Sequence, residues 1–436
     1  MQKPVVQPAS SALRILIYGI NYAGWSTGLP KYNAEMGAWL ASRGHQVDAI
    51  AGFPHYPQWR IQDEYRGRGF HVECLDGVQV HRTPLRLDSD RPVTGGRRAR
   101  LETAFTMKSM RYWLPIWLQR RRYDVVLAVC PPMQTGAWPL LYRLVRRVPW
   151  VYHVQDLQVD AAVRLGMIKR GWAGKSLHAV ESLILRQASA VSTISESMRE
   201  RIIERGVGES VVWLFPNWAD LASIRPSPAD NAFRKKLGIA TQSVVVMCAG
   251  SMGEKHGLES VLDAASRLRD RTEIVFLLIG AGSAKRRLEE QAVAEGLANL
   301  RFLPMQPLSR LSDVLAAGDI HLVVQRRNVA DLVLPSKLTN ICAAGRCCVA
   351  TADRGTTLSN VVLDHDLGVV CPPEDPNELA DAIGLLAGEP AARKRFGHNA
   401  RHYAECELGR DQILAHFEAR LRGLVSNNRP TDSQRV

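Results

Sequence analysis

Residues 243–257 read SVVVMCAGSMGEKHG, and this stretch decides the fold. Its first part is an unbroken apolar run rich in β-branched residues, which predicts a strand buried on both faces, as in a parallel sheet. Glycines at 250, 253 and 257 predict a tight turn, and residues 258–268 have the apolar spacing of a helix. Together they form the strand–turn–helix unit of a Rossmann-like domain.

The same alternation of strands and helices extends in both directions along the chain. Towards the N-terminus we expect strands at 14–18, 46–51, 78–82, 124–130, 150–154 and 190–193, with a helix at 31–43 that stops at Gly44. Prolines at 216, 226 and 228 interrupt the pattern, after which strands are expected at 243–249, 273–279, 301–303, 319–324 and 347–351. Alternating strands and helices on both sides of a break predict an α/β protein with two Rossmann-like domains.

Composition and charge limit the possible classes of protein. The chain has 436 residues, 46% hydrophobic and 23% charged, which suits two globular domains. Its net charge of +13 is uneven, because residues 1–222 hold 29 Lys and Arg against 18 Asp and Glu, while the remainder holds 27 against 25. A basic first half favours an anionic partner such as a lipid surface or a pyrophosphate-bearing substrate. Nucleic acid is disfavoured because no known binding motif accompanies the charge.

Targeting and metal signals are weak. The N-terminus passes from a polar stretch into a strand without the features of a secretory signal, and no apolar run reaches membrane-spanning length. We therefore expect a cytoplasmic protein. The eight cysteines lack metal-ligand spacing and mostly lie in apolar runs, so we expect reduced core cysteines, no metal and no cofactor.

Two basic elements of the second half could hold a diphosphate. Lys255 and His256 stand in the glycine-rich turn, at the positive end of the following helix. In the segment LPSK, Ser336 is expected to cap a helix and Lys337 to lie in its first turn, where a cation is unfavourable unless an anion is bound. Lysines in contact with solvent only are the alternative for both elements.

The first half offers weaker signals. Gly19, Gly24 and Gly28 precede its first helix and could approach a phosphate or sugar, or could simply form a packing turn. His153 ends a strand three residues before Asp156, a place from which it could orient a hydroxyl or handle a proton. A hydrogen-bonded structural histidine is the alternative.

Residues 97–122 are a candidate for membrane contact. Arginines and lysines alternate there with aromatic and aliphatic residues, among them Phe105, Met107, Trp113 and Trp117. Such a pattern is typical of a helix that lies on an anionic lipid surface. The apolar positions could instead belong to the core.

Several motifs together resemble glycosyltransferase family 4, whose members are retaining enzymes of the GT-B fold. They are GINYAGWSTGLPKYNAEMGAWLASRGHQVD, FPHYPQW, HVQDLQVDAA, FPNWAD, GSMGEKHGLE and LPSKLTNICAAGR, and the similarity spans about residues 14–420. Within the family, the colanic-acid-type fucosyltransferases of exopolysaccharide biosynthesis are most similar. The resemblance implies an acceptor-binding domain at 12–222, a nucleotide-sugar-binding domain at 223–405, and a helix at 406–425 that crosses back to the first domain. A disordered tail is expected at 426–436.

The resemblance also implies site residues. His153, Lys255 and Lys337 would serve catalysis, and Gly28, Lys31 and Asp156 would lie on the acceptor side. The donor would contact Gly250, Ser251, Gly253, His256, Gly280, Gly282, Met305, Gln306, Ser336 and Asn340. The chain departs from the family at Ser251, where many members have arginine. It also departs at Leu332 and Asn340, where many members have two glutamates.

The expected function is transfer of a sugar, with retention and without metal, from a nucleotide donor such as GDP-fucose to a polyprenyl-diphosphate-linked saccharide. The enzyme would work at the inner face of the cell membrane. A UDP-sugar or GDP-mannose donor is an alternative, as is a GT-B nucleotide-sugar epimerase. A non-catalytic assembly protein that keeps the fold is a further alternative.

Overall fold

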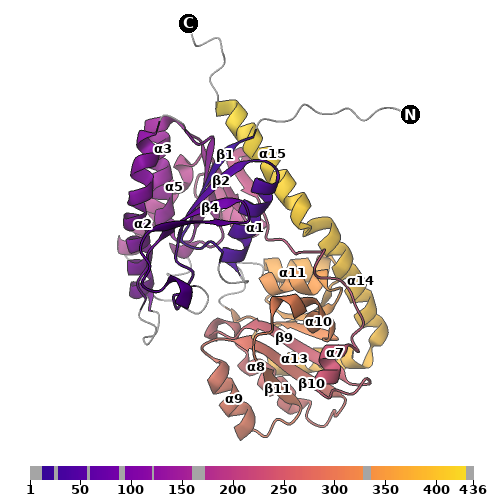
Figure 1. The fold of residues 1–436 in the computed structure, drawn as a ribbon. Coiled ribbons are helices and arrows are strands. Elements are labelled where there is room, and N and C mark those ends of the chain that lie inside the picture. The colour runs from indigo at the N-terminus through magenta and orange to yellow at the C-terminus, as the bar shows by residue number, and fades with distance from the viewer. Residues whose placement is uncertain are drawn as a thin grey trace, which may run out of the picture. The chain divides into compact units, whose positions relative to one another are not determined.

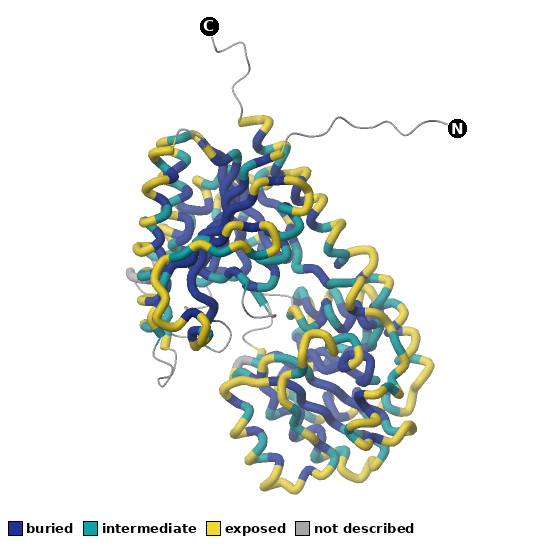
Figure 2. The backbone as a smooth tube through the Cα atoms, in the orientation of Figure 1, coloured by how far each residue is buried: buried dark blue, intermediate teal, exposed yellow. Residues whose placement is uncertain are grey.

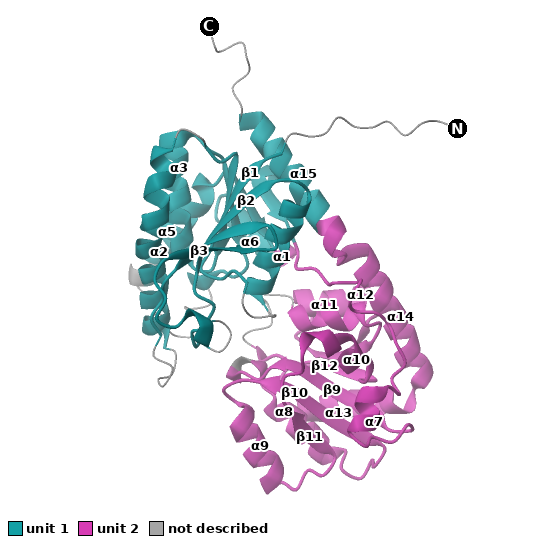
Figure 3. Cartoon of the chain, in the orientation of Figure 1, with its two compact units in different colours: residues 1–193, 198–215, 414–436 teal, residues 194–197, 216–413 magenta. Residues whose placement is uncertain are grey.

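The structure is a computed structural model that describes residues 12–23, 28–55, 59–87, 94–119, 122–159, 172–327 and 335–428. The chain divides into two units (Figure 3). Unit 1 contains the described residues of 1–193, 198–215 and 414–428, and unit 2 contains residues 194–197 and the described residues of 216–413. Each unit has a sheet of its own, so the predicted two-domain α/β architecture is confirmed.

Unit 1 is built on an eight-stranded sheet in the order β3-β4-β2-β1-β5-β6-β7-β8. Its strands are β1 Arg14–Tyr18, β2 Gln46–Gly52, β3 His71–Leu75, β4 Val78–Thr83, β5 Val125–Cys130, β6 Trp150–Val154, β7 Ala190–Thr193 and β8 Val212–Leu214. Neighbouring strands are parallel except for β3 and β4, which are antiparallel. The central strands are buried along their whole length because helices cover both faces (Figure 2).

The helices of unit 1 lie on both sides of this sheet (Figure 1). Three of them, α2 Gly95–Leu118, α3 Ala137–Arg146 and α5 Trp172–Gln187, lie side by side on one face. The others are α1 Leu29–Ser42, α6 Glu196–Glu204 and the last part of α15 Arg410–Asn428. The chain thus returns to unit 1 at its end, where Phe417 stacks on Phe215 at 3.9 Å and Glu418 Oε1 lies 3.0 Å from His45 Nε2.

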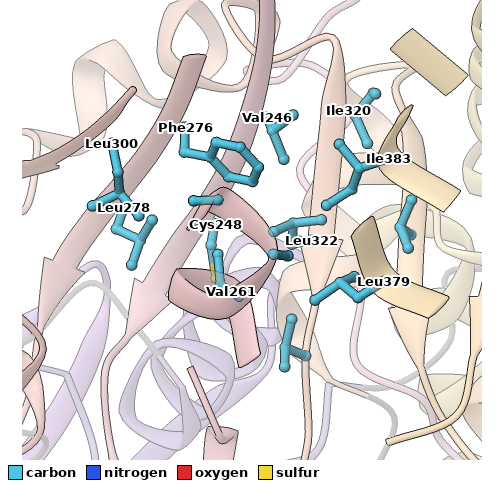
Figure 4. Packing of buried hydrophobic residues seen from close by; sticks show 14 of the residues in the cluster. Val246, Cys248, Val261, Phe276, Leu278, Leu300, Ile320, Leu322, Leu379 and Ile383 are labelled. Atoms are coloured by element: carbon cyan, nitrogen blue, oxygen red, sulfur yellow. The ribbon is translucent and has the colours of Figure 1, made fainter. Parts of the chain in front are cut away.

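Unit 2 is built on a six-stranded parallel sheet in the order β11-β10-β9-β12-β13-β14. Its strands are β9 Val244–Ser251, β10 Ile274–Ala281, β11 Leu300–Leu303, β12 Ile320–Val323, β13 Cys347–Thr351 and β14 Gly368–Cys371. Its helices are α7 Ala232–Lys236, α8 Glu259–Arg267, α9 Lys285–Ala294, α10 Leu311–Ala316, α11 Ser336–Ala343, α12 Thr357–Asp364, α13 Pro376–Gly388 and α14 Pro390–Glu407. Side chains such as Phe276, Leu322 and Ile383 pack between strands and helices (Figure 4).

Candidate functional site

The strand order of unit 2 defines where a ligand is expected. From β9 the chain continues outward through β10 and β11, then returns to β12 on the other side of β9. The connections therefore diverge between β9 and β12. In open parallel sheets, ligands bind at the carboxyl ends of the two strands that flank such a switch point. The glycine-rich turn after β9 and the helix α11 after β12 both start at this edge.

Glycines at and just after the end of β10 stand where any side chain would collide with the backbone. A Cβ on Gly280 would lie 1.8 Å from the carbonyl oxygen of Gly250, and a Cβ on Gly282 would lie 2.3 Å from that of Met252. No side chain fits at either position, because real Cβ atoms do not approach backbone oxygens so closely. The glycines predicted to contact the donor thus leave bare backbone at this edge, and a ligand can approach it closely.

Lys337 lies against the same edge. It stands in the first turn of α11, and its Nζ is 4.0 Å from Sγ of Cys248 on β9. A Cβ placed on Gly250 would be 3.8 Å from Lys337 Cε. The lysine, the glycine turn and the positive end of α11 therefore meet, and together they can stabilise an anion. The N-cap is Pro335, not Ser336 as predicted, and Ser336 is the first helical residue.

The turn after β9 is held by charged residues that no local sequence motif indicates. Arg326, just after β12, donates from Nε to the carbonyl oxygen of Glu254 at 2.7 Å and from Nη2 to both carboxylate oxygens of Glu259 at 3.2 Å. Arg287 on α9 also binds Glu254 and Glu259. Hydrogen bonding and charge from these arginines lower the pKa of the Glu259 carboxyl, against the opposing effect of desolvation. The backbone around Lys255 is thereby tied to α8, α9 and the end of β12.

Most of the other residues that are expected to contact the donor can be located on unit 2. His256 Nδ1 lies 3.3 Å from the amide nitrogen and 3.2 Å from the carbonyl oxygen of Gly253, so this ring stabilises the turn itself. Met305 and Gln306 follow β11 and are accessible, and Asn340 lies one turn into α11. Ser251 ends β9. The side chain of Lys255 and the whole of Leu332 fall outside the described residues.

His153 is a buried residue at the carboxyl end of β6 in unit 1. Its Nδ1 lies 3.0 Å from Ser192 Oγ and its Nε2 lies 3.0 Å from Gln155 Nε2. Burial lowers the pKa of the imidazole to about 4, so the ring is neutral at physiological pH. Asp156 is half-exposed and is not the partner of either ring nitrogen in these two contacts. Ser192 Oγ and Gln155 Nε2 thus lie within hydrogen-bonding distance of the two ring nitrogens, as expected for a hydrogen-bonded histidine.

The other residues expected on the acceptor side lie at the start of α1. Gly28 has a left-handed φ of 68° and precedes the helix, and its carbonyl oxygen accepts a hydrogen bond from the Lys31 amide at 3.1 Å. Lys31 pairs with Glu35 at 3.7 Å, which partly neutralises its charge. Residues 24–27 of the same turn, including Gly24, lie outside the described residues.

Most of the residues predicted to contact lipid lie in helix α2, and the structure shows which of their side chains are buried. Phe105 and Trp113 are completely buried, and both rings pack on Tyr18 of β1, at centroid distances of 5.5 Å and 5.2 Å. These aromatic side chains therefore belong to the core and cannot insert into lipid. The large apolar side chains of α2 that are exposed are Met107, Leu114 and Leu118.

Two α/β units, each built on a mainly parallel sheet, are the architecture of GT-B proteins. Known proteins agree: residues 27–218 match the family model "Glycosyl transferase 4-like domain" and residues 229–403 match "Glycosyl transferases group 1". The chain belongs to the family 4 glycosyltransferases, as predicted, and it is therefore a glycosyltransferase.

Individual relatives support this assignment. WcaI of Escherichia coli strain K12, which is assigned to colanic acid biosynthesis as a glycosyl transferase, is 38% identical over 94% of this chain and 100% of its own. Sucrose-phosphate synthase from Thermosynechococcus elongatus matches the fold with a TM-score of 0.74 at 18% identity, over 95% of this chain and 100% of its own. HepE of Anabaena, solved with UDP, has a TM-score of 0.68 at 16% identity, over 94% and 100%.

Proposed function

We propose that the enzyme transfers a sugar from a nucleotide donor held by unit 2 to a lipid-linked saccharide, in the assembly of an exopolysaccharide of the colanic acid type. The observation that carries the donor assignment is Lys337, whose side chain lies against the carboxyl end of β9 beside Gly250. A diphosphate at this edge would meet the lysine, bare glycine backbone and the N-terminus of α11. The similarity to WcaI supports the biosynthetic setting. GDP-fucose, the donor that the sequence resemblance leads us to expect, is the first donor to test.

Transfer with retention and without metal is part of the proposal. The bond between the anomeric carbon and the phosphate oxygen breaks as the acceptor oxygen bonds to that carbon from the same face, and the leaving phosphate takes the acceptor proton. Lys337 and the helix N-terminus stabilise the charge that develops on the diphosphate. His153 is neutral and bonded at both nitrogens, so its role is to position neighbouring groups rather than to exchange the proton.

The acceptor is proposed to be presented at the inner face of the membrane. Among the residues that the structure describes, no helix is both long enough and apolar enough to span a bilayer. Peripheral contact is supported by the outer surface of α2, α3 and α5, which lie side by side (Figure 1). We name as the lipid face their exposed apolar residues Met107, Leu114, Leu118, Leu141, Leu144, Val145, Val180 and Leu183. The exposed cations Arg100, Lys108, Arg111 and Arg186 on α2 and α5 suit anionic headgroups.

A thermal-shift panel of GDP, UDP, GDP-fucose, GDP-mannose and UDP-sugars tests the donor assignment. A ligand that binds only the folded state raises the midpoint of unfolding in proportion to its affinity. We expect one nucleotide series to raise the midpoint, and its sugar to be transferred when a lipid-linked acceptor is added. Absence of any shift contradicts the donor site. Formation of an epimer of the donor by NMR, without an acceptor, would show an epimerase instead.

A further inference from the structure

A connected group of side chains lies at the carboxyl edge of the unit 1 sheet. It includes neither His153 nor Lys31. Trp59 belongs to the loop after β2, Arg98 and Glu102 lie in the first turns of α2, and Gln158 follows β6. The carboxyl ends of β2 and β6 meet at one edge of a parallel sheet, so the topology brings these distant residues together. We call Trp59, Arg98, Glu102 and Gln158 the edge cluster.

Hydrogen bonds fix the polar part of the edge cluster. Glu102 is buried, with 11% of its side chain exposed, and its Oε1 accepts from Arg98 Nε at 2.8 Å and from Gln158 Nε2 at 3.1 Å. Gln158 Oε1 accepts in turn from the backbone amide of Met133, just after β5, at 2.7 Å. Both contacts to Glu102 use Oε1, so Oε2 can accept a hydrogen bond from a ligand hydroxyl.

The charge balance of the edge cluster favours an uncharged ligand. Arg98 and Glu102 form a close ion pair, so their charges largely cancel. An anion such as a phosphate would meet the Glu102 carboxylate along with the guanidinium, and repulsion would oppose its binding. Hydroxyl groups have no such penalty, because they can donate to the carboxylate and accept from the guanidinium or the amide.

Trp59 adds an aromatic surface beside these polar groups. Its backbone has a left-handed φ of 54°, a conformation that is rare for a bulky residue and that tends to occur at functional sites. The Arg98 guanidinium carbon lies 6.0 Å from the centre of the indole ring, and the ring of the buried His55 lies 5.8 Å from it. The indole is partly exposed. The indole thus presents a flat apolar surface beside the Arg98 guanidinium, which in turn binds the Glu102 carboxylate.

We propose that the edge cluster binds an uncharged pyranose ring of the acceptor saccharide. The indole of Trp59 stacks on the C–H face of the ring, while Glu102, Arg98 and Gln158 bind its hydroxyls. An aromatic wall with a few fixed polar groups is the usual composition of a small-molecule site. This inference rests on the proposed function in one respect, since it assigns the saccharide of that acceptor to particular residues.

Saturation-transfer NMR of the full-length protein with the methyl pyranosides of glucose, galactose, mannose and fucose, in both anomers, tests the proposal. We expect at least one glycoside to receive saturation, and Trp59→Ala and Glu102→Gln each to weaken its binding about tenfold or more. Trp39→Ala is the matched control. Trp39 also lies beside an arginine, Arg43 at 5.6 Å, and that arginine pairs with Glu418, but Trp39 stands near the end of α1, at the opposite edge of the sheet.

Two further measurements make each outcome decisive. Trp59→Phe keeps an aromatic surface, so it should retain most of the binding even if Trp59→Ala unfolds, and thermal melts of every variant identify unfolding. Nucleotide-induced thermal shifts should be the same in all variants. Binding of no glycoside, or equal loss in Trp39→Ala and Trp59→Ala, overturns the proposal. The nucleotide shifts would still report separately on the donor site.

Discussion

Lys337 is a residue whose position is unfavourable unless a ligand is present. A cation in the first turn of α11 opposes the helix dipole, and a bound diphosphate would reverse that penalty. We predict that Lys337→Ala lowers kcat about a hundredfold or more, since removing one preorganised charge contact has such an effect elsewhere. Initial rates at saturating donor measure it. Lys255→Ala is expected to have an effect of the same size.

The matched control is Lys236→Ala, which removes an exposed lysine from the last turn of α7. It lowers the net charge equally but should leave kcat unchanged. Near-normal kcat in both Lys337→Ala and Lys255→Ala would contradict the donor site. An equal fall in Lys236→Ala would point to net charge rather than to a specific contact.

At the scale of the element, sequence patterns predict the interior of each sheet well. The buried strands β1, β6, β7 and β13 have the predicted bounds. In an α/β protein, short apolar runs between turns usually form buried strands. The strands that were not predicted, β3, β8 and β14, lie at sheet edges. They have three to five residues and incomplete burial, so only tertiary pairing identifies them.

Residues of the candidate site could be predicted from the sequence only where they lie within a single local motif. Gly250 lies in the strand-to-turn pattern at the end of β9, and Lys337 lies in the pattern that starts helix α11. In contrast, the contact of Arg326 with Glu259 joins residues 67 positions apart, and it arises because β12 returns beside β9. The burial of α2 was present in the sequence as an apolar helical periodicity, since Phe105 and Trp113 are separated by about two turns and share a face.

The helix layer of unit 1 supports a prediction about membranes. Leu144 and Val145 on α3 are 69% and 60% exposed. Replacing both with glutamate removes apolar area from the lipid face and adds charge that anionic lipid repels. We expect binding to vesicles of phosphatidylglycerol and phosphatidylcholine to weaken about tenfold or more, as flotation would measure.

Unit 2 supplies the control for that experiment. Val293 on α9 and Leu385 on α13 are 82% and 63% exposed, so the pair of changes to glutamate there alters charge and apolar exposure to a similar extent. Flotation should be preserved in this control. Equal weakening by both double variants would mean that net charge alone governs binding, and no weakening by either would exclude the lipid face.

At the scale of the whole molecule, three buried histidines link stability to pH. Burial lowers the pKa of His55 and His153 in unit 1 and of His321 in unit 2 to about 4. In the unfolded chain each imidazole has a pKa near 6.5 and gains a proton below it. The unfolded state therefore binds more protons between about pH 6.5 and pH 4, and each histidine makes the folded state less stable as the pH falls through that window.

The size of this effect can be predicted and measured in unit 2. His321 Nε2 lies 2.9 Å from the carbonyl oxygen of Leu315, and the Nε2–H of a neutral ring donates to it. At pH 5 the difference between the two pKa values should cost about 2 kcal/mol relative to pH 7. The variant His321→Gln keeps a donor but cannot titrate. Although its stability at pH 7 should be lower, the loss between pH 7 and pH 5 should shrink by about 2 kcal/mol. Denaturant unfolding of unit 2, followed at both pH values with the donor nucleotide absent, measures this difference. An unchanged loss would show that His321 does not carry the pH dependence.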